Sequence, residues 1–125
     1  MIHVIVRIDF NSDEAIYIQL RNQIILGIAN SEFKEGDNLP SVRELAENIG
    51  INMHTVNKAY TILKQEGYLK LDRRKGAVIS VEADRCKAMM DMMNVLQVVL
   101  AEAYCKDITR EEVHEAVDNI FNEFL

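Results

Sequence analysis

Residues 51–60 (INMHTVNKAY) combine hydrogen-bonding side chains with apolar residues at helical spacing. His54, Thr55 and Asn57 carry short polar side chains that can donate or accept hydrogen bonds. We expect them, together with Lys58, on the outer face of a helix, where they could meet the base edges or the backbone phosphates of a nucleic acid. The spacing of the apolar residues predicts the buried face of the same helix, which comprises Val56, Ala59, Tyr60 and Leu63.

Positive charge is concentrated in the same region of an otherwise acidic chain. The 125 residues have a formal net charge of −6, whereas residues 51–79 carry six basic and two acidic residues. Three of the basic residues, Arg73, Arg74 and Lys75, are consecutive. A local excess of this kind is typical of a defined surface that faces an anion.

Capping signals divide the segment before the hairpin into two helices. Ser41 and Glu44 form an S-x-x-E pattern, which predicts a helix that starts directly after the serine. Gly50 interrupts the apolar pattern, and Asn52 can cap the helix that follows. We expect this second helix to end at residue 66, with Gly67 just past its C-terminus.

The segment after Gly67 reads as a β-hairpin, with YLKL and AVISV as strands and DRRKG as a basic turn. Two capped helices followed by such a hairpin form a helix-turn-helix with a wing. The second helix would then enter the major groove of double-stranded DNA. Arg73, Arg74 and Lys75 would reach the neighbouring minor groove or the backbone.

Two further elements precede this motif. Apolar residues alternate in MIHVIVRIDF, at Ile2, Val4, Val6, Ile8 and Phe10, which predicts a strand rather than a signal peptide. A helix is expected from about residue 15 to residue 30, because Ile16, Leu20, Ile24 and Ile28 form one stripe.

The pattern becomes helical again from Ala83. A heptad-like seam and a second apolar stripe share one long helix, and Thr109 and Glu112 cap another helix after it. A helix with two apolar faces needs two partners, so residues 83–125 should pair two copies of the chain. The residues expected at this interface are Met89, Met93, Leu96, Leu100, Val117, Ile120, Phe121 and Phe124.

The sequence offers no catalytic or cofactor motif. It has no glycine-rich phosphate loop, no nucleophile with a plausible base and no metal-ligand spacing among its three histidines. Cys86 and Cys105 are interpreted as small buried side chains, with an intersubunit disulfide or a redox switch as the alternative. Because no apolar run is long enough to span a bilayer, we expect a cytoplasmic protein without membrane contact.

Residues 1–82 resemble the DNA-binding domain of GntR-family transcription regulators. The resemblance rests on GDNLPSVRELA (36–46), INMHTVNKAY (51–60), Glu66-Gly67, the RRKG turn and IYIQL (16–20). The short two-helix tail is similar to that of the YtrA subfamily. This resemblance implies a dimeric bacterial regulator, often a repressor of its own operon, which commonly encodes an ABC transporter.

The resemblance also assigns roles to individual positions. Arg43 matches the family arginine that contacts DNA, and Gly76 matches the second glycine of the wing turn. Arg74 replaces the first wing glycine, and Met53 and Asn57 stand where arginine is common, so the family's base preference does not carry over. The residues expected to contact DNA are Arg43, Asn52, Met53, His54, Thr55, Asn57, Lys58, Arg73, Arg74, Lys75 and Gly76.

Together these observations predict a mostly helical α+β protein with a winged helix-turn-helix DNA-binding domain (1–82) and a helical dimerisation tail (83–125). We expect a homodimeric repressor that binds a palindromic operator without a cofactor. A small-molecule effector, if there is one, would have to use the dimer interface or a small groove near it. The alternative is a winged-helix protein-interaction module that does not bind DNA.

Overall fold

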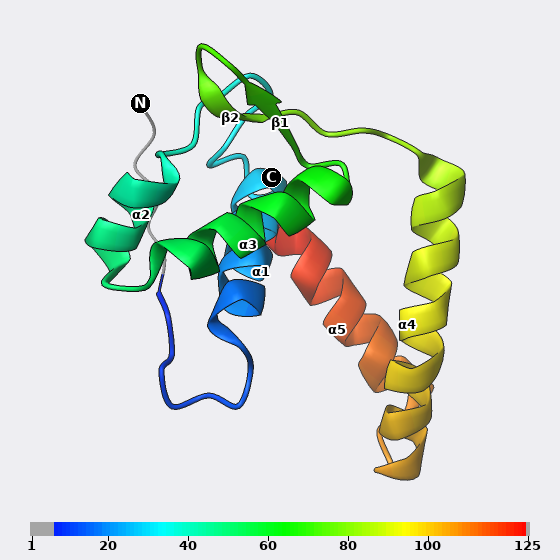
Figure 1. Ribbon diagram of the computed structural model, residues 1–125. Coiled ribbons are helices and arrows are strands. Elements are labelled where there is room, and N and C mark those ends of the chain that lie inside the picture. Colours follow the sequence, from blue (N-terminus) through cyan, green and yellow to red (C-terminus); the bar gives the residue numbers. More distant parts are fainter. Residues whose placement is uncertain (1–6, 125) are drawn as a thin grey trace. The chain divides into compact units, whose positions relative to one another are not determined.

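Five helices and one two-stranded sheet make up residues 7–124, the part of the chain that the computed structural model describes (Figure 1). The helices are α1 (Ile16–Ala29), α2 (Val42–Ile49), α3 (Met53–Gln65), α4 (Arg85–Cys105) and α5 (Arg110–Glu123). Strands β1 (Leu69–Asp72) and β2 (Gly76–Ile79) pair antiparallel and follow α3 in the sequence. The predicted class, a mostly helical α+β fold with a winged helix-turn-helix before two C-terminal helices, is confirmed.

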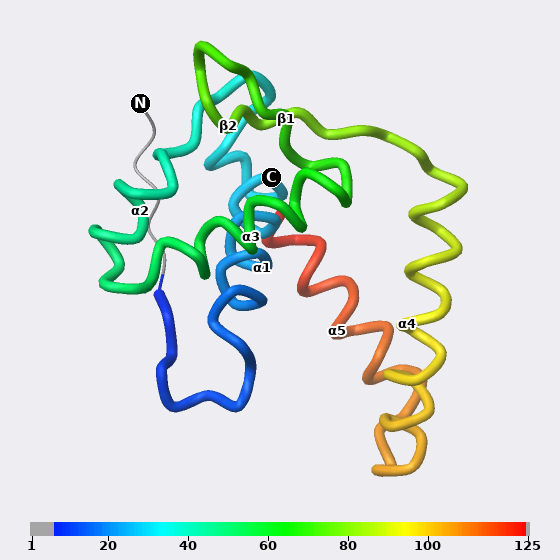
Figure 2. The backbone as a smooth tube through the Cα atoms, viewed as in Figure 1, coloured from blue at the N-terminus to red at the C-terminus, as the bar shows by residue number. Residues whose placement is uncertain are grey.

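The chain divides into two compact units, Met1–Glu82 and Ala83–Leu125. The first unit contains α1, α2, α3 and the hairpin, and the second contains α4 and α5, as the backbone path in Figure 2 shows. Among residues 7–124, no helix has both the length and the apolar character needed to cross a bilayer.

Helix α3 is central to the core of the first unit. It packs against α1, α2 and β1, and the side chains of Val56, Ala59 and Leu63 on its inner face are fully buried. Because this face supplies core residues, the opposite face of α3 is left to solvent. The buried cluster comprises Leu20, Ile24, Phe33, Leu39, Leu45, Ala46, Val56, Ala59, Tyr60, Leu63, Leu69, Ala77 and Ile79.

Local capping groups set the start of α2 and α3 as predicted. Ser41 Oγ accepts the backbone N–H of Glu44 at 3.1 Å, and Asn52 Oδ1 accepts that of His54 at 2.7 Å. Gly50 ends α2 with a φ of +79°, a conformation that residues other than glycine rarely adopt. The hydrogen bond from the Glu44 N–H to Ser41 Oγ is one half of the predicted capping box. In the other half the Glu44 carboxylate would accept the backbone N–H of Ser41, but in the described hydrogen bonds it accepts the Ser41 hydroxyl instead, at 3.4 Å.

A third extended segment pairs with the wing, which the hairpin pattern does not reveal. β1 and β2 are in register from Leu69 opposite Ile79 to Asp72 opposite Gly76. The segment before Pro40 runs along the other side of β2: Ile79 N–H donates to Asp37 O at 2.8 Å, and Leu39 N–H donates to Ala77 O at 2.9 Å. These bonds join the wing to the segment that leads into α2.

The expected N-terminal strand is wrong where the structure describes it, at residues 7–10, and its residues 2–6 lie outside the described part. Two glutamines of α1 take up the backbone groups that a neighbouring strand would have paired. Asp9 N–H donates to Gln19 Oε1 at 2.9 Å, and Gln19 Nε2 donates back to Asp9 O at 3.0 Å. Gln23 makes the same pair of bonds with Arg7.

The second unit has capped helices but no described side chain that is buried within it. Asp84 Oδ1 accepts the N–H of Lys87 at the start of α4, and Thr109 and Glu112 form both halves of the predicted capping box of α5. The expectation that Cys86 and Cys105 are buried is wrong for the single chain, in which both are exposed. They are exposed because α4 has no buried face in the single chain.

Candidate nucleic-acid interface

The outer face of α3 presents five of the eleven residues predicted to contact DNA. Asn52, Met53, His54, Asn57 and Lys58 are all exposed, opposite the buried residues of the same helix. Thr55 differs from them, because it is partly buried at the edge of this face. The first two turns of α3 therefore expose a row of polar side chains with one methionine among them.

The N-terminal end of α3 is suited to an anion. Asn52 caps the helix through its side-chain oxygen, and the first turn contains no acidic residue. The backbone N–H groups of a first helical turn carry partial positive charge, which attracts phosphate. Asn52 therefore also has a structural task in holding this end of α3, besides the DNA contact predicted for it.

Lys58 is directed toward α1. Its Nζ lies 4.0 Å from the ring centroid of Tyr17, a half-buried residue of that helix, in a cation–π contact. This contact holds the ammonium at the margin of the α3 outer face, so Lys58 is better placed for a backbone phosphate than for a base.

Helix α2 is fixed to α3 by a buried hydrogen bond. The Tyr60 hydroxyl of α3 donates to the Pro40 carbonyl, just before α2, at 2.8 Å. Burial, and secondarily the charge of Glu44, raises the pKa of Tyr60 well above its usual value, so this hydroxyl keeps its proton. The anchor holds the start of α2, where Arg43 is exposed in the first turn.

An aspartate holds the basic turn of the wing. Asp72 Oδ1 accepts the backbone N–H groups of Arg74 at 2.7 Å and Lys75 at 3.1 Å. These two hydrogen bonds lower the pKa of Asp72. Gly76 follows the turn with a φ of +79°, a left-handed conformation that favours glycine. The side chains of Arg73, Arg74 and Lys75 remain exposed.

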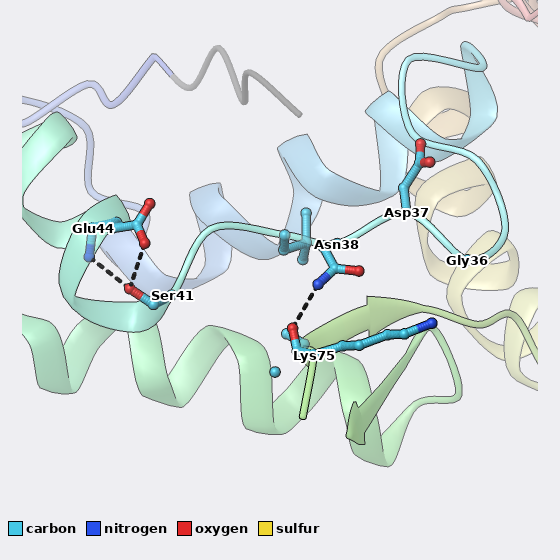
Figure 3. Close-up of a pocket in the computed structure, with 9 residues that line it drawn as sticks. Gly36, Asp37, Asn38, Ser41, Glu44 and Lys75 are labelled. Atoms are coloured by element: carbon cyan, nitrogen blue, oxygen red, sulfur yellow. Dashed lines mark hydrogen bonds between the residues drawn. The ribbon is translucent and has the colours of Figure 1, made fainter. Parts of the chain in front are cut away.

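A second side chain fixes the same turn from the opposite direction. Asn38 Nδ2 donates to the Lys75 carbonyl at 2.6 Å, as Figure 3 shows. Neither Asn38 nor Asp72 was predicted from the sequence as a positioning residue. For Asp72 a local signal existed, because an aspartate at the start of a turn often accepts backbone N–H groups two residues on. For Asn38 there was none, because its partner is 37 residues away.

A hollow of about 730 Å³ lies between the wing and the start of α2 (Figure 3). Its lining includes the carboxylates of Asp37 and Glu44, and Lys75 is its one basic residue. The Lys75 side chain extends away from Ser41 and Glu44 (Figure 3). Two carboxylates make this hollow a poor phosphate site, so the outer surfaces of α3 and the wing remain the candidate nucleic-acid surface. In the described residues, no group of His, Cys, Asp and Glu side chains is placed to hold a metal ion.

Comparisons with known proteins agree with this architecture. The family model described as "Bacterial regulatory proteins, gntR family" matches residues 13–79. The HTH-type transcriptional repressor YtrA of Bacillus subtilis is 35% identical over 118 residues, which cover 92% of this chain and 91% of that protein.

Solved structures extend the likeness to both units. YtrA from Sulfolobus acidocaldarius, a GntR-family transcription factor, is 36% identical with a TM-score of 0.59, over 94% of this chain and 97% of that chain. A transcriptional antiterminator from Listeria monocytogenes is 26% identical with a TM-score of 0.85, over 93% of this chain and 89% of that chain. Because the family model covers more than half of the residues and YtrA proteins match nearly the whole chain, this protein belongs to the GntR family of transcription regulators, in its YtrA-like subfamily, and is not an enzyme.

Proposed function

We propose that this chain is a homodimeric repressor that binds a palindromic DNA operator through residues 1–82. The observation that carries the proposal is the exposed polar face of α3, which starts at a capped helix end without acidic residues in its first turn. In this proposal α3 enters the major groove. Arg73, Arg74 and Lys75 contact the backbone or the minor groove beside it, and Arg43 contacts a phosphate near the start of α2.

The dimer is proposed to form through residues 83–125. In the single chain, large apolar side chains of α4 and α5 are exposed to solvent, among them Leu100 (41%), Ile120 (50%) and Phe121 (67%). No residue of either helix is buried. An apolar surface of this kind is usually covered in solution, and a second copy of the chain would cover both helices at once. The proposed interface residues are Met89, Met93, Leu96, Leu100, Val117, Ile120, Phe121 and Phe124.

Repression would be steric, by a dimer that occupies a site at its promoter. The relative from Bacillus subtilis is described as a repressor, which supports this direction of regulation. On the same likeness to YtrA-like regulators, we propose that the regulated operon encodes an ABC transporter. A two-fold dimer should read half-sites separated by about one helical turn of DNA or a multiple of it.

The test is selection of binding sites from a randomised duplex pool at about 0.15 M salt, without added ligand. We expect enrichment of one palindrome, with an affinity that falls steeply as the salt concentration rises, because released counterions accompany each phosphate contact. A shuffled version of the palindrome is the control. If the folded protein enriches no sequence, the proposal is wrong, and a winged-helix module with a protein partner becomes the better interpretation.

A further inference from the structure

Two side chains of the α3 outer face, those of Met53 and Asn57, do not belong to the core and carry no charge that would attract a phosphate. Met53 is 44% exposed and lies outside the core cluster and the side chains that pack against it. Asn57 is exposed one helical turn later. Residues four positions apart lie on the same helix face, separated by roughly 6 Å along the axis. Because base pairs in B-DNA are spaced by about 3.4 Å, these two side chains would meet base pairs no more than about two steps apart.

In its first two turns this face has no arginine and no unengaged lysine to read guanine through both its O6 and N7 atoms. Guanine is recognised in the major groove mainly by arginine or lysine, which donate to its O6 and N7 atoms. α3 contains no arginine, and the ammonium of Lys58 is engaged with the Tyr17 ring 4.0 Å away. His54 is the other exposed polar residue near the N-terminal end, and its ring can donate to any purine N7.

Resting on the DNA-binding function proposed above, we infer that α3 reads two A·T pairs, no more than about two steps apart, in each half-site. The Asn57 carboxamide accepts from adenine N6 and donates to adenine N7, the pairing that its donor and acceptor geometry fits. The Met53 side chain contacts the C5-methyl group of thymine in the other pair, which an apolar side chain can recognise. Met53 and Asn57 are thus specificity-determining residues.

The experiment uses the full chain and the palindrome selected in the test above. Selections with Met53→Ala and Asn57→Ala identify the positions that each side chain reads, because preference flattens only there. At these positions we replace thymine by uracil, which lacks the methyl group, and adenine by 7-deazaadenine, which lacks the N7 acceptor. Binding of wild-type protein should fall about threefold with uracil and about tenfold with 7-deazaadenine, in line with the strength of such contacts.

Each variant should be insensitive to the analogue that removes its own partner. Met53→Ala should bind the uracil and thymine duplexes equally, and Asn57→Ala should do the same for 7-deazaadenine and adenine. Gln65→Ala, an exposed position in the last turn of α3, is the control and should respond to both analogues as wild type does. Asn57→Arg should shift the preference at its position from adenine to guanine.

Failure of the inference and failure of the proposed function give different results. Specific binding with G·C pairs at the positions that respond to Asn57→Ala would overturn the inference and leave the regulator proposal intact. If the wild type and the variants were equally sensitive to the analogues, the inference would likewise be overturned and the regulator proposal would stand. If the folded wild-type protein shows no sequence preference, the proposed function itself is overturned, and the inference with it.

Discussion

At the scale of single residues, a few side-chain hydrogen bonds hold the backbone beside the predicted DNA-contacting groups. The Tyr60 hydroxyl reaches the Pro40 carbonyl, and Asp72 and Asn38 hold the wing turn from both sides. None of these three residues has to touch DNA for its hydrogen bonds to matter. Each one fixes the backbone from which a candidate contact residue projects, so its loss should affect either stability or affinity in a measurable way.

Tyr60→Phe should lower the free energy of unfolding by about 1–3 kcal/mol, because the buried Pro40 carbonyl would lose its partner. Chemical denaturation measures this change. The matched control is Tyr104→Phe, since Tyr104 is 83% exposed and its hydroxyl faces solvent, so its removal should change stability by less than about 0.5 kcal/mol. Equal effects of the two variants would show that the hydrogen bond to Pro40 does not stabilise the fold.

Asp72→Ala and Asp72→Asn have the same net charge, so a comparison of the two variants tests whether the hydrogen bonds to Asp72 position the wing turn. Both variants remove one negative charge, but the asparagine keeps an oxygen that can accept the N–H groups of Arg74 and Lys75. We expect the alanine variant to bind operator DNA about fivefold more weakly than the asparagine variant, which corresponds to about one hydrogen bond. Fluorescence anisotropy titrations measure the difference, and identical affinities would refute a positioning role for Asp72.

The same anchor predicts a pH dependence. The two backbone hydrogen bonds lower the pKa of Asp72 from its usual 3.8, so they favour the ionised form. Their contribution is complete above the usual pKa and is lost as the pH falls through the lowered one. NMR should therefore show the amide resonances of Arg74 and Lys75 constant above about pH 5 and shifting only in strong acid. In Asp72→Asn these acid shifts should be absent.

At the scale of elements, signals confined to a few neighbouring residues predicted the structure well. Ser41, Asn52 and Gly67 set helix ends through groups within four residues, so their roles were visible in the sequence. The hydrogen bond from Asn38 to the wing turn and the pairing of Asp37 with Ile79 join segments about 40 residues apart, which no local pattern reveals. For the same reason the alternating N-terminal segment suggested a strand, although Gln19 and Gln23 occupy its backbone groups.

Packing between α1 and the loop after it makes a further prediction. A Cβ atom added to Gly27 would lie 2.4 Å from Phe33 Cε2, and Phe33 is a buried core residue. Gly27→Ala should therefore lower the free energy of unfolding by about 1–3 kcal/mol through overpacking, although alanine is the better helix former. In a Phe33→Leu background the same change should cost less, because the ring edge is gone. Thermal or chemical unfolding of the four proteins gives this coupling.

At the scale of the whole molecule, the two units differ in charge: the second unit is acidic, and the first contains the region with an excess of positive charge. Residues 83–125 carry four basic and nine acidic residues, whereas residues 51–79 carry six basic and two acidic residues. The acidic unit should be repelled by DNA, which favours binding through the first unit alone. The core cluster of the first unit draws none of its residues from α4 or α5. A change that disrupts the tail should therefore leave the DNA-binding fold intact.

This separation predicts that dimerisation and half-site recognition can be uncoupled by one substitution. Leu100→Asp places a charge on the proposed interface of α4, where Leu100 is 41% exposed in the single chain, and should make the protein monomeric in sedimentation analysis. Binding to the full palindrome should then fall by about 100-fold, because the second half-site is no longer held at high effective concentration. Binding to an isolated half-site should stay unchanged. Glu115→Gln, an exposed polar position on α5, is the control and should remain dimeric. A monomeric wild type, or a Leu100→Asp variant that keeps full affinity for the palindrome, would contradict the proposal that residues 83–125 set the spacing of two DNA-binding units.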